Sequence, residues 1–215
     1  MMRPLEMPHH GTSGVLITFC GLDGCGKTTM IRRLMAELEG EYSLFLTKQP
    51  TDAVRSSEIF RGFMDTPDHD AYDYRSLSLL AASDRLQHVK SVILPQLRQG
   101  RIVLSDRYFY SCLANLRARG FEGDEWIYEI ARAVIRPDLA FFLDVPVELA
   151  VERVRRRPSE RDRYIDLPLQ HRLRAEYRDI CLASGGKLIP TEEDEETCYQ
   201  MIKEKVKEVL YRENI

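Results

Sequence analysis

Residues 21–29 read GLDGCGKTT, so three glycines, one lysine and two threonines stand together directly after an apolar run. The first eight residues match the pattern G-x-x-x-x-G-K-[ST] without a gap. In this pattern backbone N–H groups surround a phosphate chain, the lysine reaches the β- and γ-phosphates, and the threonine ligates Mg²⁺. The sequence therefore predicts a nucleotide phosphate site, formed by Gly21, Asp23, Gly24, Cys25, Gly26, Lys27, Thr28 and Thr29.

Two other interpretations of this glycine loop (residues 21–29) fit the residues less well. A dinucleotide-binding fingerprint needs G-x-G-x-x-G, but the position that should close it after Gly24 and Gly26 is Thr29. An accidental glycine-rich turn would not require a strand before it and a helix after it, and both are predicted here.

A second candidate group follows the apolar run that ends in Ser105, where the chain continues with Asp106 and Arg107. Because ligands of open α/β sheets bind at the carboxyl ends of strands, Asp106 is expected to face the glycine loop. A carboxylate at this place holds Mg²⁺ through water, and the adjacent guanidinium grips a phosphate with two hydrogen bonds. The alternative is a surface Asp–Arg pair at a strand end.

A third candidate is arginine-rich. Residues 153–163, RVRRRPSERDR, contain six arginines in a chain whose formal net charge is −3. Mobile arginines stabilise the charge that develops during phosphoryl transfer, and Pro158 breaks a helix, as a closing loop requires. We therefore expect a lid over residues 153–166, with Arg155 and Arg161 as catalytic candidates. A solvated helix end or a patch for nucleic acid are the alternatives.

The elements that must position these groups alternate between strand and helix, which is typical of a parallel sheet flanked by helices. Strands are predicted at residues 15–20, 43–47, 102–105, 139–143 and 187–189, and helices at 27–38, 74–97, 147–156, 168–181 and 194–211. The valine, isoleucine, leucine and phenylalanine content of the strands suits burial on both faces.

Bulk composition limits the class of protein. The chain has 215 residues, of which 44% are hydrophobic, so it should form one soluble domain. Its negative net charge disfavours a dedicated nucleic-acid binder, and no run reaches the roughly 18 apolar residues of a membrane span. Five scattered cysteines suggest reduced thiols in the cytoplasm.

The first 13 residues are expected to form a flexible leader, because they lack the apolar segment of a signal peptide. His9 and His10 offer metal ligands within this leader. A disordered tail is the simpler interpretation of the segment.

Taken in order, these pieces resemble the thymidylate kinase family of nucleoside monophosphate kinases. The resemblance runs from about Gly14 to the C-terminus and rests on GLDGCGKTT, TKQP (47–50), LLAASDRLQHV (79–89), DRYFYSCLA (106–114), FFLDVPVELAVERVRRR (141–157) and RDRYIDLPLQHRLRAEYRDI (161–180). It implies a P-loop α/β/α fold over residues 14–215 with a five-stranded parallel sheet. It also implies Mg²⁺-dependent transfer of the ATP γ-phosphoryl to dTMP, in a cytoplasmic homodimer. Because the glycine loop lacks arginine, the catalytic arginines would come from the lid, as in the bacterial type of the family.

The resemblance also assigns acceptor residues. Asp23 would approach the 3′-hydroxyl of the acceptor sugar, Arg85 the base edge, and Arg107 the acceptor phosphate. Lys48 and Gln49 occupy the positions of arginine and glutamate in the motif REP of the family. The remaining acceptor residues expected from these blocks are Ala81, Tyr108, Ser111 and Asn115.

Three departures from the family pattern concern thymine recognition. Ala81 replaces the phenylalanine that stacks on the base, and Asn115-Leu116 replaces a tyrosine and a base-reading glutamine. Loss of a stacking ring costs about 1–3 kcal/mol per base, so we expect weak discrimination between dTMP and dUMP. Alternatively, neighbouring aromatic residues fill the same space, namely Tyr72, Tyr74, Tyr108, Phe109 and Tyr110.

Two other functions stay open at this point. One is a kinase for a different nucleotide or a phosphorylated metabolite, and the other is a nucleotide-binding sensor without transfer activity. Lys27, Thr28, Asp106 and Arg107 favour an enzyme over a sensor, because the transfer chemistry needs each of them.

Overall fold

The apolar runs of the chain form one parallel sheet in a computed structural model, which describes residues 2–65 and 71–213. Within this part of the chain the sheet has five strands in the order β2-β3-β1-β4-β5. Their bounds are β1 Val15–Gly21, β2 Leu44–Lys48, β3 Ile102–Asp106, β4 Leu139–Asp144 and β5 Lys187–Pro190. Each predicted strand is found, with ends that differ by one residue. The expected α/β class with a five-stranded parallel sheet is confirmed.

Helices connect the strands and cover both faces of the sheet. The described helices are α1 Lys27–Leu38, α2 Asp52–Arg55, α3 Glu58–Asp65, α4 Tyr74–His88, α5 Leu94–Arg98, α6 Tyr110–Arg117, α7 Trp126–Ala131, α8 Val147–Arg155, α9 Leu167–Ser184 and α10 Glu195–Glu213. Sequence periodicity did not indicate α2, α3, α6 or α7, which are all short. No helix in the described residues has the length and apolar character needed to span a membrane.

The helix predicted at residues 74–97 is interrupted. After α4 the chain makes a π-helical turn, η1 Val89–Ile93, and then continues as α5 with Pro95 in its first turn. Proline has no backbone N–H and its ring crowds the preceding turn, so a regular α-helix cannot run through it. The wider π turn accommodates the proline without ending the helical path.

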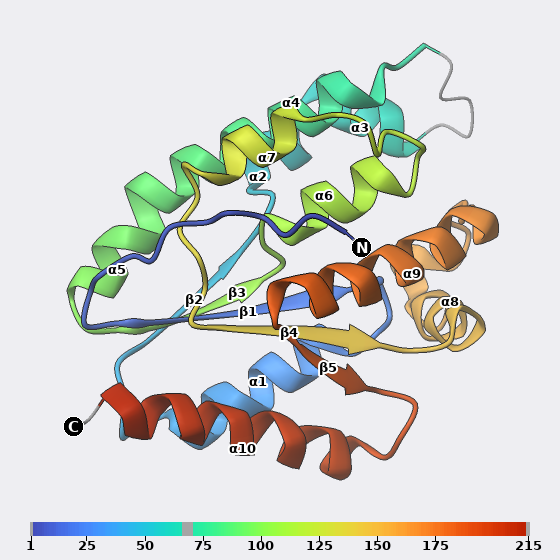
Figure 1. Cartoon of the computed structure of the whole chain (residues 1–215). Coiled ribbons are helices and arrows are strands. Elements are labelled where there is room, and N and C mark those ends of the chain that lie inside the picture. Colours follow the sequence, from blue (N-terminus) through green and yellow to red (C-terminus); the bar gives the residue numbers. More distant parts are fainter. Residues whose placement is uncertain (1, 66–70, 214–215) are drawn as a thin grey trace.

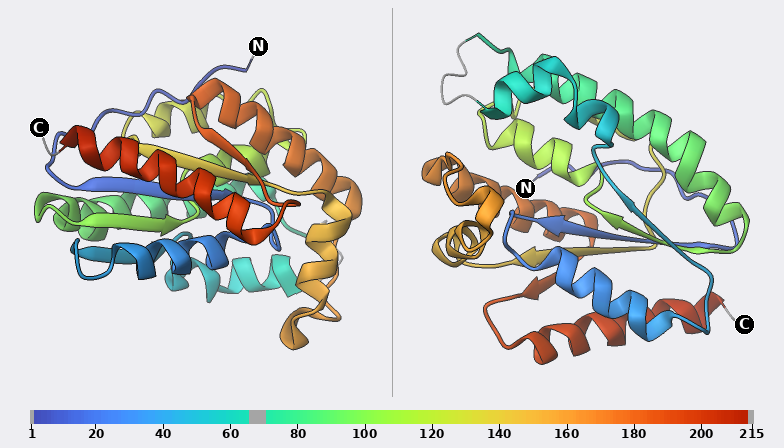
Figure 2. Two further views of the ribbon diagram at one scale, coloured as in Figure 1. Left: turned by 90° about the horizontal axis from the view of Figure 1, so that it is seen from below. Right: turned by 180° about the vertical axis from the view of Figure 1, so that it is seen from behind.

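The layers are visible in Figures 1 and 2. Helices α1 and α10 pack against one face of the sheet, and α6, α9 and the α4–α5 segment pack against the other. All strands point the same way, so their carboxyl ends meet at one edge, where α8 also lies. The core strands β1 and β3 are buried along their whole length, as expected for a sheet covered on both faces.

The leader contacts distant parts of the domain. From residue 2 onward it runs across the upper helical layer in Figure 1 before it turns into β1. Met7 is 9% exposed within the core, and the carbonyl of Pro8 accepts a 2.7 Å hydrogen bond from the Arg136 N–H. Arg3 pairs with Glu125 at 2.6 Å. The segment has no regular secondary structure, yet distant residues hold it in place.

One glycine at the junction of leader and strand leads to a stability prediction. A Cβ on Gly14 would lie 2.6 Å from the carbonyl oxygens of both Leu97 and Arg101. Because these are backbone atoms, Gly14→Ala should lower the free energy of unfolding by about 1–3 kcal/mol. The melting temperature should then fall by roughly 2–4 °C per kcal/mol.

The matched control is Gly123→Ala, since a Cβ there meets nothing within 4 Å. Its melting temperature should stay close to that of the wild type. Equal melting temperatures for both variants would contradict the close packing at Gly14.

Candidate active site

The carboxyl ends of the strands surround a cavity of about 960 Å³. It is lined by the glycine loop, by the end of β3, by one face each of α4 and α6, and by the segment after α8. These segments come together because the strands pair in parallel. Phe19 of β1 and Lys48 of β2 both lie opposite Asp106 of β3. The three candidate groups found in the sequence therefore converge on one cavity.

The glycine loop turns its backbone towards the cavity. Gly24 and Gly26 have φ angles of 84° and 95°, a region that favours glycine. A Cβ on Gly24 would also lie 2.2 Å from the Ala150 carbonyl oxygen. Gly26 precedes α1 without a side-chain cap, so the first N–H groups of this helix are left for a ligand.

Lys27 is held in place by the loop itself. Its Nζ donates to the carbonyl oxygens of Leu22 at 2.7 Å and Gly21 at 3.2 Å, and the residue is only 7% exposed. The neighbouring Cys25 is fully buried and does not line the cavity, and its Sγ lies 3.6 Å from Lys27 Nζ. Lys27, Thr28 and Thr29 do line the cavity.

Asp106 presents an unsatisfied carboxylate at the end of β3. Its Oδ1 is buried and has no hydrogen-bond partner in the part of the chain that the structure describes, and its Oδ2 lies 3.8 Å from Lys48 Nζ. A buried charged oxygen of this kind is costly unless a ligand or ion satisfies it. Because Thr28 lines the same cavity, the two oxygen donors expected for Mg²⁺ are present there.

Arg107 links β3 to the glycine loop. It has a φ angle of 70°, which is uncommon for a non-glycine residue, and its guanidinium pairs with Asp23. The same guanidinium donates to the Gly21 carbonyl and the Tyr177 hydroxyl, both at 3.1 Å. Arg107, with smaller effects from Lys27 and Arg163 and against the effect of burial, holds the pKa of Asp23 well below its usual range.

The arginine-rich segment contains the helix break that the sequence predicts at Pro158. Helix α8 ends at Arg155, and a 3₁₀ turn, η2 Pro158–Glu160, begins at the proline that was expected to break the helix. Arg153 donates to the Thr191 carbonyl at 2.9 Å, so the start of the predicted lid is anchored to the domain.

The arginines that line the cavity are not the expected Arg155 and Arg161. Arg157 and Arg163 line it, and Arg163 lies 3.3 Å from Asp23. Arg155 instead lines a separate hollow on the outside of α8 with Glu148 and Glu152, and Arg161 lines neither. The reason is geometric: Arg155 projects from the helix face opposite the cavity, and the chain turns after Pro158.

The far end of the cavity contains the residues expected to meet an acceptor base. Ala81 and Arg85 line it from α4, and the Arg85 guanidinium donates to the Ala81 carbonyl at 2.9 Å. Arg85 Nε is buried and finds no hydrogen-bond partner within residues 2–65 and 71–213. Ser111 and Asn115 line it from α6, but the Asn115 amide already bonds to Ser111 and Arg119.

The aromatic residues near the base position separate into two groups. Tyr74 and Phe63 line the cavity with ring centroids 5.4 Å apart. Tyr108 is fully buried and donates to the Ile135 carbonyl at 2.8 Å, so it does not take the acceptor position expected for it. Its neighbours Phe109 and Tyr110 also belong to the core.

Gln49 does not line the cavity either. Its side chain is fully buried, and both amide atoms lack a hydrogen-bond partner among the described residues. The Gln49 backbone N–H donates to the Asp106 carbonyl at 3.0 Å, so the backbone of Gln49 lies beside the end of β3. Lys48, by contrast, is expected at the acceptor phosphate and does line the cavity.

Ser78 and Arg119 are among the cavity residues that the sequence analysis did not assign. Ser78 Oγ is buried, has no hydrogen-bond partner among the described residues, and lies one helical turn before Ala81. The Arg119 guanidinium lies 4.0 Å above the Tyr74 ring and donates to Asn115 Oδ1 at 2.9 Å. Helical spacing from Ala81 identifies Ser78, whereas Arg119 required recognition of α6 as a helix.

Known proteins with similar sequences cover most of the chain. The family model for thymidylate kinase matches residues 19–207. A probable thymidylate kinase of Pyrococcus horikoshii is 38% identical over 169 residues, which cover 76% of this chain and 81% of that protein. The thymidylate kinase of onion yellows phytoplasma is 32% identical over 205 residues, covering 91% of this chain and 98% of that protein.

These matches agree with the geometry of the cavity, in which the glycine loop, Asp106-Arg107 and the arginine-rich segment face one another. The matched region also contains every element that lines the cavity. The chain therefore belongs to the thymidylate kinase family.

Proposed function

We propose that this chain transfers the γ-phosphoryl group of ATP to dTMP, with ADP and dTDP as products. The observation that carries the proposal is the single cavity that joins the glycine loop to Arg107, Ala81 and Arg85. A donor phosphate chain at the loop and an acceptor phosphate at Arg107 would lie end to end, as an in-line transfer requires. The γ-phosphoryl passes from the β-phosphate oxygen of ATP to an oxygen of the acceptor phosphate.

Thr28 and Asp106 are the residues that would hold Mg²⁺. The unpartnered buried Oδ1 of Asp106 supports this assignment. When bound, the ion neutralises charge on the phosphate oxygens of ATP. Asp106 and Thr28 would hold the ion, and Lys27 stabilises the charge that develops on the phosphate oxygens.

The acceptor would be held by charge at one end and by hydrogen bonds at the other. Arg107 and Lys48 bind its phosphate, and Asp23 accepts a hydrogen bond from its 3′-hydroxyl. Arg157 and Arg163 are the lid arginines that reach the transferring group, in place of Arg155 and Arg161. Their place in the lining of the cavity supports this assignment.

The base end favours bases with carbonyl edges. Arg85 and Arg119 are donors without any acceptor capacity, so they suit the carbonyl oxygens of thymine or uracil and disfavour the amino group of cytosine. Ala81 leaves space where a stacking ring is expected, and Tyr74 and Phe63 offer aromatic surface nearby. These features support weak discrimination between dTMP and dUMP.

The remaining assignments follow the family resemblance. We propose a cytoplasmic homodimer whose catalytic domain spans residues 14–215.

The direct test of the proposed reaction is Lys27→Ala. This variant should lower kcat by at least about 100-fold, because the lysine stabilises charge in the transition state. The assay follows ADP and dTDP formation, and the melting temperature reports the fold. Lys90→Ala, which removes an exposed lysine, is the control with wild-type turnover expected. Normal turnover in folded Lys27→Ala protein would exclude the loop from the mechanism.

The lid assignment is tested by Arg163→Ala. The variant should lower kcat on the order of 100-fold, because one charge-stabilising donor is lost from the transition state. The control is Arg156→Ala, since that side chain is 73% exposed and pairs with Glu152. Similar kcat values for the two variants would contradict a specific role for Arg163.

Ser78 tests the base pocket. Ser78→Ala should lower kcat/KM for dTMP by about 2–12-fold, the value of one hydrogen bond. The loss should be equal for dUMP, because thymine and uracil have the same polar edges, and KM for ATP should not change. Ser83→Ala on the exposed side of α4 is the control. An unchanged kcat/KM would show that Ser78 does not contact the acceptor.

A further inference from the structure

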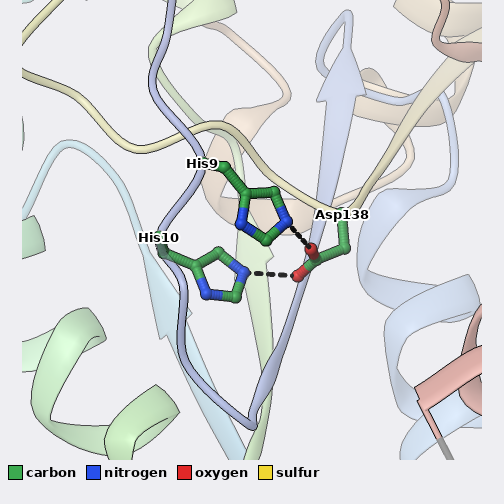
Figure 3. A group of neighbouring side chains, drawn as sticks. All are labelled: His9, His10 and Asp138. Carbon is green, nitrogen blue, oxygen red and sulfur yellow. Dashed lines mark hydrogen bonds and ion pairs between the residues drawn. The ribbon is translucent and has the colours of Figure 1, made fainter.

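A second group of ligand-type side chains lies at the opposite edge of the sheet from the cavity. His9 and His10 of the leader turn towards Asp138, which directly precedes β4 (Figure 3). Asp138 also joins the start of β1, because its Oδ2 accepts the Leu16 N–H at 2.7 Å. The group is therefore separate from the proposed magnesium site at the carboxyl ends of the strands.

Hydrogen bonding explains only part of this group. His10 Nε2 lies 2.7 Å from Asp138 Oδ2, a normal hydrogen-bond distance. His9 Nε2 lies 3.6 Å from Asp138 Oδ1, which is too long for a hydrogen bond. The His9 ring nevertheless stacks on His10 with centroids 4.8 Å apart and points its nitrogen at the carboxylate, although its side chain is 58% exposed.

The spacing fits ligands of one metal ion. One atom from each of the three side chains lies within 4.8 Å of the others. Nitrogen and oxygen ligands of tetrahedral Zn²⁺ bind at about 2.0–2.2 Å, so neighbouring ligand atoms lie roughly 3.4 Å apart. The His9–Asp138 distance is already close to this value. The His10–Asp138 distance is 2.7 Å, so the His10 ring would move back by about 0.7 Å as the ion replaces its proton.

The surrounding hydrogen bonds support this arrangement. The His10 side chain is 1% exposed and that of Asp138 is 11% exposed, so two of the three ligands are already fixed. His10 Nδ1 lies 2.8 Å from the Thr12 hydroxyl and accepts the Thr12 backbone N–H at 3.2 Å, as His9 Nδ1 accepts the Gly11 N–H at 3.1 Å. When Nε2 holds a metal, the proton moves to Nδ1, and that of His10 is then donated to the Thr12 hydroxyl in place of the backbone contact. Metal-binding histidines commonly have such a partner, and the Asp138–Leu16 hydrogen bond holds the carboxylate in the same way.

We propose that His9, His10 and Asp138 bind one transition-metal ion of the Zn²⁺ class. Two imidazole nitrogens and one carboxylate leave a fourth position for water, and this ligand set selects Zn²⁺, Co²⁺ or Ni²⁺ over Mg²⁺. The ion joins the leader to the junction of β1 and β4. Metal binding therefore stabilises the folded domain and the docked leader together.

The experiment uses the untagged full-length protein, freed of metal with a chelator and titrated with Zn²⁺ by calorimetry. One ion per chain is expected, and the melting temperature should rise by several degrees at saturation. Co²⁺ should give the visible absorption of a four-coordinate site. The cysteines of the described chain are all buried, so they do not compete as exposed ligands.

Variants identify the ligands. His10→Ala should weaken Zn²⁺ binding by about 100-fold or more, and Thr12→Val by about 10–100-fold. Because His10 is buried, His9→Ala is the variant that keeps the test valid if His10→Ala fails to fold. It should weaken binding at least about 10-fold and leave the melting temperature of the metal-free protein unchanged.

The matched control is His171→Ala, since His171 is 57% exposed and lies 3.4 Å from Glu148 on another surface. This variant should bind Zn²⁺ like the wild type. The proposal is overturned if the wild type binds no Zn²⁺, or if His9→Ala binds it as tightly as the wild type does.

Discussion

The parallel pairing of β1 with β3 is the constraint on which the candidate site depends. Because both strands run in the same direction, the glycine loop after β1 and the Asp106-Arg107 pair after β3 emerge at the same edge of the sheet. The Arg107 N–H donates to the Phe19 carbonyl at 2.8 Å, so the contact between the two strands continues to the arginine itself. An antiparallel arrangement would place these groups at opposite edges.

Charge balance explains how the cationic side chains of the cavity are arranged. Lys27, Arg107 and Arg163 converge on a small volume, and Asp23 and nearby carbonyl groups satisfy them. Phosphate groups offer the same kind of oxygen acceptor with more charge, so a nucleotide can replace these internal partners. The low pKa of Asp23 keeps its carboxylate ionised, and Arg107 is therefore oriented before a ligand arrives.

The two edges of the sheet carry different kinds of residues. At the carboxyl edge, cations and glycines surround an open cavity. At the amino edge, the leader packs its apolar residue Met7 into the core and brings His9 and His10 to Asp138. Strands β1 and β4 connect the two edges, so the leader contacts and the glycine loop belong to the same sheet. The two groups of residues nevertheless share no member.

Contiguous sequence patterns determined the strands, α1, the glycine loop and the family. Their information is local: burial on both faces requires an apolar run, and the glycine loop obtains its chemistry from eight adjacent residues. The break of α8 before Pro158 is local for the same reason.

Side-chain direction required the tertiary structure. Tyr108 and Tyr74 are equally aromatic in the sequence, but the first is buried against Ile135 and the second lines the cavity. Arg155 and Arg163 are equally basic, and only the path of the chain after Pro158 separates them. The leader has no long apolar run, and among its contacts is Asp138, more than 120 residues away in sequence. Contacts between segments this far apart depend on how the layers pack, which no local pattern of residues contains.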